Sequence, residues 1–213
     1  MKNFSSDMDI NVDTKLPQTE NYYESNAQNY YESTLKIDMT DVYDLFLKNI
    51  PKSGRILDAG SGSGRDTLAF LKRGYEVDAF DASESLAKLS SQLTGLETKV
   101  IKFQNFESLP IYDGIWACAS LLHVPKKEMN SCIQRLLKAL KPNGAIYVCF
   151  KLGNLERVAN DGRFYTDLNE KQLREILSKF SNIKILDIWT YSQKNTAGAV
   201  SNWVNAIAIK NRE

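Results

Sequence analysis

The part of the 213-residue sequence most suited to binding a ligand is an acidic residue followed by alternate glycines: Asp58 precedes Gly60, Gly62 and Gly64. Alternate glycines let a backbone pass close to a bound molecule, because no Cβ atom fills the space. The dinucleotide-binding pattern needs a glycine three places after its second one, and this chain has Arg65 there. Because the Asp58 carboxylate would repel a phosphate, the turn favours a cationic or amino-bearing ligand over one with a pyrophosphate.

A second acidic residue completes the pattern. Residues 75–81 read as an apolar-rich strand that ends in Asp81. A carboxylate at the end of the second strand of such a unit can bind the hydroxyl pair of a ribose. The sequence therefore predicts a ligand that contains a nucleoside with a free ribose.

In these two features the chain resembles the class I S-adenosylmethionine-dependent methyltransferases, whose first motif is acid-x-Gly-x-Gly-x-Gly and whose second strand ends in an acid. The resemblance extends from about residue 22 to residue 210. Residues 105–110, 112–123 and 140–144 are similar to the family's third-strand exit, its fourth strand with the following loop, and its turn into the fifth strand. The resemblance implies S-adenosylmethionine as the cofactor, with the small-molecule and tellurite-resistance branches as analogies. A small methyl acceptor is expected because 213 residues leave no room for an added nucleic-acid-binding module.

The resemblance also assigns roles to residues. Asp81 would bind the ribose, Asn105 the adenine amino group, and the Phe106 amide the adenine ring, with Gln104 as the alternative to Asn105. Asp58 would bond to the cofactor's amino group, directly or through water. The expected cofactor-binding residues are Asp58, Gly60, Ser61, Gly62, Gly64, Arg65, Asp81, Ala82, Asn105, Phe106, Ala119 and Tyr30.

The sequence allows two roles each for His123 and Arg65. His123, the only histidine, follows the predicted fourth strand, so it is either a general base or substrate-orienting group, or a histidine bonded to backbone. Arg65 binds either the cofactor's carboxylate or the neighbouring Asp66.

Several aromatic and basic residues are candidates for the walls of the site. Their alternative is ordinary packing or solvent exposure, and aromatic faces would suit a sulfonium cation. These candidates are Tyr22, Tyr23, Tyr30, Tyr31, Lys151, Arg163, Phe164, Tyr165, Trp189 and Trp203.

Alternating strand and helix patterns predict an α/β fold with a mostly parallel sheet covered on both faces. With the resemblance, the expected fold is a three-layer Rossmann-like sandwich whose seven-stranded sheet ends in an antiparallel C-terminal hairpin. We expect a flexible tail over residues 1–20 and a single methyltransferase domain over 21–213. Within it, residues 21–50 form cap helices, 51–150 the cofactor-binding core and 151–168 a loop on the acceptor side.

Local signals place several element ends. Ser83 is a predicted helix cap, Pro125 a helix start, and Asn169 with Gln172 a capping box. Residues 183–192 and 203–210 read as two antiparallel strands joined around Gly198.

Composition narrows the functional classes. A formal net charge of +1 gives no electrostatic argument for nucleic acid or for an anionic membrane, and 43% hydrophobic residues suffice for a substantial core. No basic start with an apolar core is present at the N-terminus, so a cytoplasmic location is expected. The cysteines, Cys118, Cys132 and Cys149, lie in apolar patterns and are expected to be reduced. With one histidine, no metal site is predicted.

Two other functions remain open at this point. A nicotinamide-dependent oxidoreductase would use a Tyr with a Lys four positions later, and Tyr147 with Lys151 has that spacing, although within a predicted strand. A non-catalytic protein that binds S-adenosylmethionine as a sensor or scaffold would keep the same motifs.

Overall fold

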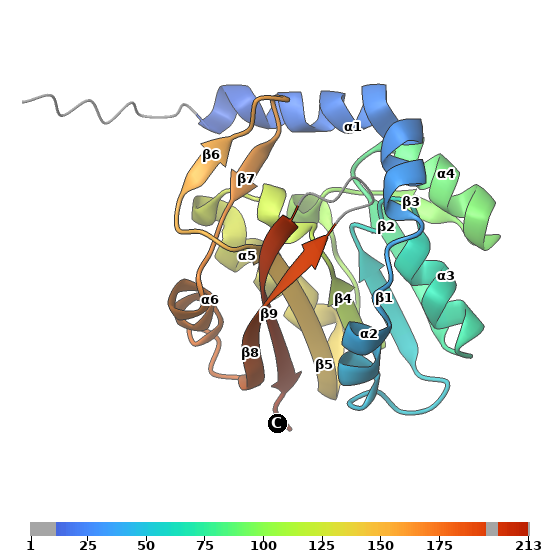
Figure 1. Ribbon diagram of the computed structural model, residues 1–213. Coiled ribbons are helices and arrows are strands. Elements are labelled where there is room, and N and C mark those ends of the chain that lie inside the picture. The colour runs from blue at the N-terminus through green and yellow to red at the C-terminus, as the bar shows by residue number, and fades with distance from the viewer. Residues whose placement is uncertain (1–11, 195–199, 213) are drawn as a thin grey trace, which may run out of the picture.

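The computed structural model describes residues 12–194 and 200–212, and its centre is a seven-stranded sheet in the order β3-β2-β1-β4-β5-β9-β8 (Figure 1). Neighbouring strands from β3 to β5 are parallel, while β9 is antiparallel to both β5 and β8, which confirms the expected sheet. The strands are β1 (Arg55–Ala59), β2 (Glu76–Asp81), β3 (Thr98–Val100), β4 (Tyr112–Ala117), β5 (Leu140–Lys151), β8 (Ile183–Lys194) and β9 (Val200–Lys210).

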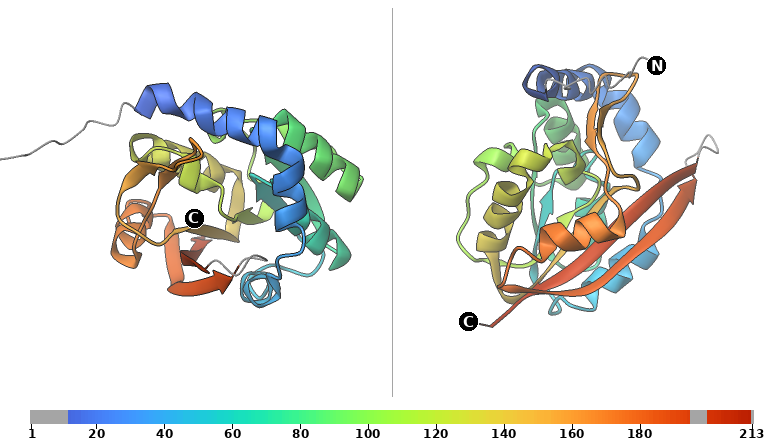
Figure 2. Two further views of the ribbon diagram at one scale, coloured as in Figure 1. Left: turned by 45° about the horizontal axis from the view of Figure 1, so that its top comes forward. Right: turned by 90° about the vertical axis from the view of Figure 1, so that its left-hand side faces the viewer.

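Successive strand residues point to opposite faces of the sheet, and both faces are buried. Leu57 of β1 and Ile115 of β4 belong to the hydrophobic cluster that includes α5 and α6. Ile56 and Trp116, one position away, belong to the cluster with α2 and α3, so helices cover both faces (Figure 2). The helices are α2 (Thr40–Leu47), α3 (Arg65–Lys72), α4 (Glu84–Thr94), α5 (Lys126–Ala139) and α6 (Glu170–Leu177), with short 3₁₀ turns η1 (Phe103–Asn105) and η2 (Leu121–His123).

The predicted helix caps are confirmed. Ser83 Oγ accepts from the Leu86 amide at 3.2 Å, and Pro125 is the N-cap of α5. Asn169 Oδ1 accepts from the Gln172 amide at 2.9 Å while Gln172 Oε1 accepts from the Asn169 amide at 3.2 Å. These bonds satisfy amides that the first helical turn leaves without partners.

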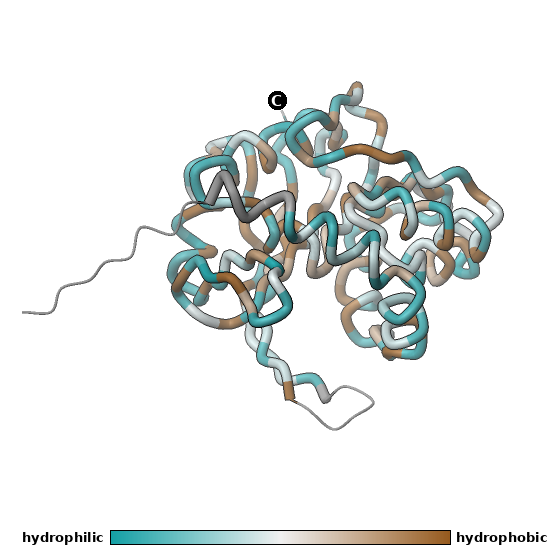
Figure 3. Tube along the Cα trace, turned by 90° about the horizontal axis from the view of Figure 1, so that it is seen from above, coloured by the Kyte–Doolittle hydropathy of each residue, from teal (hydrophilic) through white to brown (hydrophobic). Residues whose placement is uncertain are grey.

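The N-terminal helix begins earlier than predicted. Helix α1 spans Val12–Thr34 and crosses the molecule when it is seen from above (Figure 3). Within it, Thr19 is buried and Glu20 forms an ion pair with Lys102. Residues 12–20 of the predicted flexible tail therefore belong to α1, and residues 1–11 lie outside the described part of the chain.

The predicted acceptor-side loop contains a small hairpin. Strands β6 (Glu156–Val158) and β7 (Phe164–Thr166) pair antiparallel, with Glu156 opposite Thr166. The strand signal was missed because Phe164 and Tyr165 are both buried, which removes the alternation typical of a surface strand. The hairpin packs against α1 and η2.

The C-terminal strands agree with the prediction, and β8 and β9 pair from Ile183 with Lys210 to Lys194 with Val200. The predicted turn at Gly198 lies outside the described residues. No helix of the described part of the chain combines the length and apolar character that a membrane crossing requires.

Candidate active site

The turn after β1 forms the floor of the site. The amides of Gly60 and Ser61 donate to the Phe80 carbonyl at 2.9 and 3.0 Å, which fastens the turn to β2. Gly60 has φ +80°, in the left-handed region that favours glycine. A Cβ atom on Gly60 would lie 2.4 Å from Ser120 Cβ, so both conformation and space require glycine here.

The Asp81 carboxylate is held in a fixed orientation at the end of β2. Its Oδ2 accepts from the Gly62 amide at 2.8 Å and its Oδ1 from the Ser83 amide at 2.9 Å. Burial raises the pKa of Asp81, and the backbone amides oppose that rise. Each oxygen keeps a second lone pair, so the carboxylate can still accept hydrogen bonds from a ligand.

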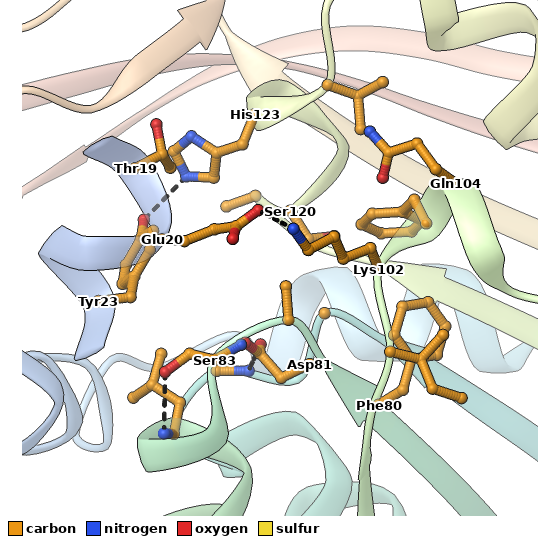
Figure 4. Close-up of a pocket in the computed structure, with 18 of the residues that line it drawn as sticks. Thr19, Glu20, Tyr23, Phe80, Asp81, Ser83, Lys102, Gln104, Ser120 and His123 are labelled. Carbon is orange, nitrogen blue, oxygen red and sulfur yellow. Dashed lines mark hydrogen bonds and ion pairs between the residues drawn. The ribbon is translucent and has the colours of Figure 1, made fainter. Parts of the chain in front are cut away.

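A cavity of about 410 Å³ lies over this turn and this carboxylate (Figure 4). It unites the ends of β1, β2 and β4 with helix α1 and the turn η1. The expected residues that line it are Tyr30, Gly60, Gly62, Asp81, Ala82, Asn105, Ala119 and His123. Thr19, Glu20, Lys102 and Gln104 also line it; the first three had not been assigned to the site, and Gln104 was the alternative to Asn105.

An ion pair joins two residues that line this first cavity. Glu20 Oε1 of α1 lies 2.6 Å from Lys102 Nζ, which follows β3 (Figure 4). No motif links these two side chains, which are far apart in the sequence. Only the fold brings them together, so sequence alone offered no signal for this contact.

Asp58 lines neither this cavity nor the second cavity that adjoins it. Its carboxylate is buried behind the glycine turn, where Oδ2 accepts from Thr67 Oγ1 at 2.6 Å. Burial and the nearby Asp66 charge raise the pKa of Asp58 to about 8. The expected contact with the cofactor's amino group therefore has no direct support, because the side chain is directed to α3.

Gly64 and Phe106 also lie away from the cavities. Gly64 is the N-cap of α3, and a Cβ atom on it would lie 2.6 Å from Ser90 Oγ, so this glycine permits helix packing. Phe106 is buried, with its ring stacked on Phe80 at 4.9 Å, and its amide donates to the Phe103 carbonyl at 3.4 Å. Residues 101–105, which end in the turn η1, thus line the first cavity, whereas the Phe106 side chain lies in the core.

Arg65 binds its neighbour Asp66. Nε and Nη2 of Arg65 lie 2.6 and 2.9 Å from the two Asp66 oxygens. Asp66 also accepts from Trp116 Nε1 at 2.8 Å and from the Tyr43 hydroxyl, so the acid is saturated. Of the two interpretations of Arg65, the pair with Asp66 is the one present in the structure. Arg65 also lines the second cavity.

A second cavity of about 510 Å³ adjoins the first. Both are lined by Tyr23, Tyr30, Gly60, Gly62, Ala119 and His123. The second cavity is otherwise lined by α1, the segment before α2, the glycine turn with the start of α3, η2, and the ends of β4, β5, β7, β8 and β9. Ser61, an expected cofactor-binding residue, lines this cavity and not the first. Among the candidate wall residues, Tyr22, Lys151, Arg163, Tyr165 and Trp203 line it; Tyr31, Phe164 and Trp189 do not.

Both ring nitrogens of His123 are occupied. Nδ1 lies 2.6 Å from the Phe164 carbonyl and Nε2 lies 2.8 Å from the Tyr23 hydroxyl. Because a carbonyl can only accept, Nδ1 carries the proton and Nε2 accepts from Tyr23. Burial lowers the pKa of His123 to about 4, so the ring is neutral at pH 7. His123 is therefore bonded to backbone, which was one of its two interpretations. The Tyr23 hydroxyl occupies Nε2, the nitrogen that a general base would need.

Tyr147 does not form the dyad that an oxidoreductase would need. Its hydroxyl donates to Asn205 at 2.8 Å, and its side chain is fully buried within β5. Lys151 instead donates to Ser201 Oγ at 2.8 Å. Tyr147 and Lys151 are two positions of the same strand, β5, and do not form a catalytic pair.

The parallel strands of this Rossmann-like fold end at the two adjoining cavities. The chain belongs to the methyltransferase domain family, which matches residues 31–197. This membership confirms the resemblance to the class I S-adenosylmethionine-dependent methyltransferases, and it confirms S-adenosylmethionine as the cofactor at the level of the family. The tellurite-resistance branch remains a prediction.

Relatives in sequence are also methyltransferases by name. An uncharacterized methyltransferase of Staphylococcus carnosus (strain TM300) is 24% identical over 141 residues, which are 62% of this chain and 66% of that protein. A ubiquinone biosynthesis O-methyltransferase of Xylella fastidiosa (strain 9a5c) is 32% identical over 114 residues, 49% of this chain and 45% of that protein. The matched regions thus cover less than two thirds of both relatives' lengths.

Solved structures share the fold. A Burkholderia thailandensis 1,6-didemethyltoxoflavin-N1-methyltransferase, with its substrate and S-adenosylhomocysteine bound, has a TM-score of 0.72 at 20% identity; 93% of this chain and 89% of that chain are covered. The N-methyltransferase NodS of Bradyrhizobium japonicum WM9, with S-adenosylhomocysteine, has a TM-score of 0.71 at 13% identity, covering 92% and 100%. At these identities the likeness establishes the architecture.

Proposed function

We propose that this chain transfers the methyl group of S-adenosylmethionine to a small acceptor, with the cofactor in the first cavity and the acceptor in the second. The observation that carries this proposal is the shared wall. Tyr30, Ala119 and His123 line both cavities, so two ligands bound there would meet at these residues. Methyl transfer needs this kind of direct alignment between two bound molecules.

The residues of the first cavity fit the cofactor. The oriented Asp81 carboxylate can accept from both ribose hydroxyls, and Asn105 or Gln104 can bind the adenine edge. Ser61 Oγ, which lines the adjoining second cavity, is buried and has no hydrogen-bond partner among the described residues, so a polar group of a ligand that reaches it would satisfy it. The volume of about 410 Å³ falls in the range of roughly 300–1,000 Å³ that is typical of small-molecule sites.

When bound, S-adenosylmethionine supplies a methyl group activated by a positively charged sulfur. The chain's own contribution is to position both molecules and exclude water. Tyr23 and Tyr30 pack edge to face at 5.1 Å beside the shared wall, and aromatic faces attract a cation. No covalent assistance from a side chain is required for such a displacement.

In this proposal His123 orients rather than abstracts a proton. Its bond to the Phe164 carbonyl fixes the ring, and the ring in turn fixes the Tyr23 hydroxyl. Arg163 Nη1 lies 3.4 Å from the same hydroxyl. His123 and Arg163 are positioning residues for Tyr23, which with Tyr30 is one of the two tyrosines of α1 that line both cavities.

The test replaces Asp81 with alanine and measures S-adenosylhomocysteine binding by calorimetry. We expect affinity to fall by about 1–3 kcal/mol, or roughly 5- to 150-fold, because buried hydroxyls lose a charged partner. Asp78→Ala is the matched control, since Asp78 lies on the same strand but pairs with Arg55 outside both cavities. Unchanged affinity in a folded Asp81→Ala protein would contradict the ribose assignment.

A separate measurement distinguishes an enzyme from a sensor that only binds the cofactor. The wild-type protein is incubated with S-adenosylmethionine and a panel of small acceptors, and S-adenosylhomocysteine formation is followed. An enzyme produces S-adenosylhomocysteine with at least one acceptor class. A sensor binds the cofactor in the calorimetric test and leaves it intact.

A further inference from the structure

The second cavity carries more positive than negative charge. Its cations are Arg65, Lys151 and Arg163, and Asp66 is the single acid among the described residues that line it. Asp66 already accepts hydrogen bonds from Nε and Nη2 of Arg65. Arg163 is paired with Asp161, which does not line the cavity.

Lys151 is the cation that these pairs leave uncompensated. Its Nζ donates to Ser201 Oγ at 2.8 Å and lies 3.9 Å from the centre of the Trp203 ring. Within the described ranges it forms no ion pair with a carboxylate. Burial and the charges of Arg157 and Arg163 lower the pKa of Lys151, while the Asp167 charge opposes this change, and the net effect disfavours the charged form of Lys151. A negatively charged ligand would reverse that penalty.

A second observation at the same place concerns Trp203. Its indole Nε1 is buried and has no hydrogen-bond partner in the described part of the chain. An indole N–H can only donate, and an unpartnered buried donor costs free energy. Trp203 thus presents a donor that lacks an acceptor beside the Lys151 ammonium, in a cavity that Tyr165 and Tyr191 also line.

From these contacts we infer that the methyl acceptor is an anion: a small, partly apolar molecule with a carboxylate or phosphate group that Lys151 binds at the Trp203 side of the second cavity. The inference rests on the proposed function, since it assigns the second cavity to the acceptor. The anionic group would supply the missing partner of the Lys151 ammonium, and the apolar part would pack on the tyrosine rings.

The experiment uses the full chain saturated with S-adenosylhomocysteine, so that binding is measured without turnover and the cofactor's own carboxylate is already in place. Calorimetry compares benzoate, phenyl phosphate and benzamide, which share a phenyl ring and differ in charge. We expect one of the two anions to bind at least about tenfold more tightly than neutral benzamide, as for hydrogen bonds to a charged group. The tighter anion identifies the group as a carboxylate or a phosphate.

Variants locate the effect. Lys151→Met is expected to abolish the preference for the anion, and Lys151→Arg to retain it because the charge remains. Lys179→Met removes the same charge from an exposed position after α6 and is expected to change nothing. All three are first checked for unchanged S-adenosylhomocysteine affinity.

The inference is overturned if benzamide binds as tightly as the anions, if neither anion binds at millimolar concentration, or if Lys151→Met keeps the preference. It is also overturned if Lys151→Met weakens S-adenosylhomocysteine binding about tenfold, since the ammonium would then serve the cofactor. Failure of the wild-type protein to bind S-adenosylhomocysteine at all would instead reject the proposed function.

Discussion

The two cavities are built in different ways. Asp81, which lines only the first, is held by two backbone amides, so its place follows from the glycine turn and the end of β2. Lys151 and Ser201, which line only the second, are held by a side-chain contact across 50 positions. Tyr23 and His123 are 100 positions apart and line both cavities. A polar group held by backbone follows from a local motif, whereas one held by side chains depends on tertiary packing.

The difference predicts separable effects of substitution. Changes at the first cavity should alter cofactor affinity together with the stability of the turn. Changes at the second cavity should leave cofactor affinity nearly unchanged and alter acceptor binding or the local network of α1, η2 and β7.

The largest effect is expected for Gly60→Ala. The left-handed conformation costs about 1–2 kcal/mol for a residue with Cβ, and the clash with Ser120 adds about 1–3 kcal/mol of overpacking. Gly74→Ala is the matched control, because Gly74 also has positive φ, +84°, but no atom within 4 Å of an added Cβ. Urea unfolding and S-adenosylhomocysteine titration of both variants measure the difference.

Equal stability of the Gly60→Ala and Gly74→Ala proteins would contradict the close packing of the turn against Ser120. A stable Gly60→Ala protein with full cofactor affinity would further show that the backbone of this turn does not approach the ligand.

The next effect concerns His123 and pH. Its pKa is about 4 in the folded protein, below the unfolded value of about 6.5, so the unfolded chain binds the proton more readily. The stabilisation is complete above pH 6.5 and is lost as pH falls toward 4. Between pH 7 and pH 5 the loss is about 2 kcal/mol in the free energy of unfolding.

The control for this pH dependence is His123→Asn, which removes the titrating group. Other carboxylates titrate in both proteins, so the difference between wild type and variant isolates His123. The same change in unfolding free energy from pH 7 to pH 5 in both proteins would mean that His123 is accessible to solvent and protons in the folded state.

A smaller effect is expected for Tyr23→Phe, which removes the hydroxyl that donates to His123. The loss of one hydrogen bond should lower the free energy of unfolding by about 1 kcal/mol. Cofactor affinity should change less than in Asp81→Ala. Tyr31→Phe, in the same helix but away from both cavities, should be neutral. If the two tyrosine variants are equally stable, the Tyr23–His123 bond does not contribute to the fold.

The sequence predicted what short, continuous patterns encode. The mostly parallel sheet, the caps at Ser83 and Asn169, and the glycine turn followed from local patterns, and the seven strands followed from the family resemblance. A motif names residue types in a strand or turn, but it does not say where each side chain points. Asp58 therefore turned out to face Thr67, and Phe106 to face the core, although both lie in motif positions.

The second cavity was harder to predict because its contacts depend on tertiary packing. Arg163 Nη1 donates to the Tyr23 hydroxyl at 3.4 Å across 140 positions, and neither residue belongs to a motif. The short strands β6 and β7 lie in a polar segment that resembles a loop. Lys151, Arg163 and Trp203 were candidates for the site walls, yet only the fold placed them around one cavity.

The most direct test of the central claim is calorimetric titration of the wild-type protein with S-adenosylhomocysteine and, in parallel, with NADH. The two-cavity account predicts one-to-one binding of S-adenosylhomocysteine and no heat from NADH, since Arg65 replaces the glycine that a pyrophosphate requires. Preferential binding of NADH would contradict the account.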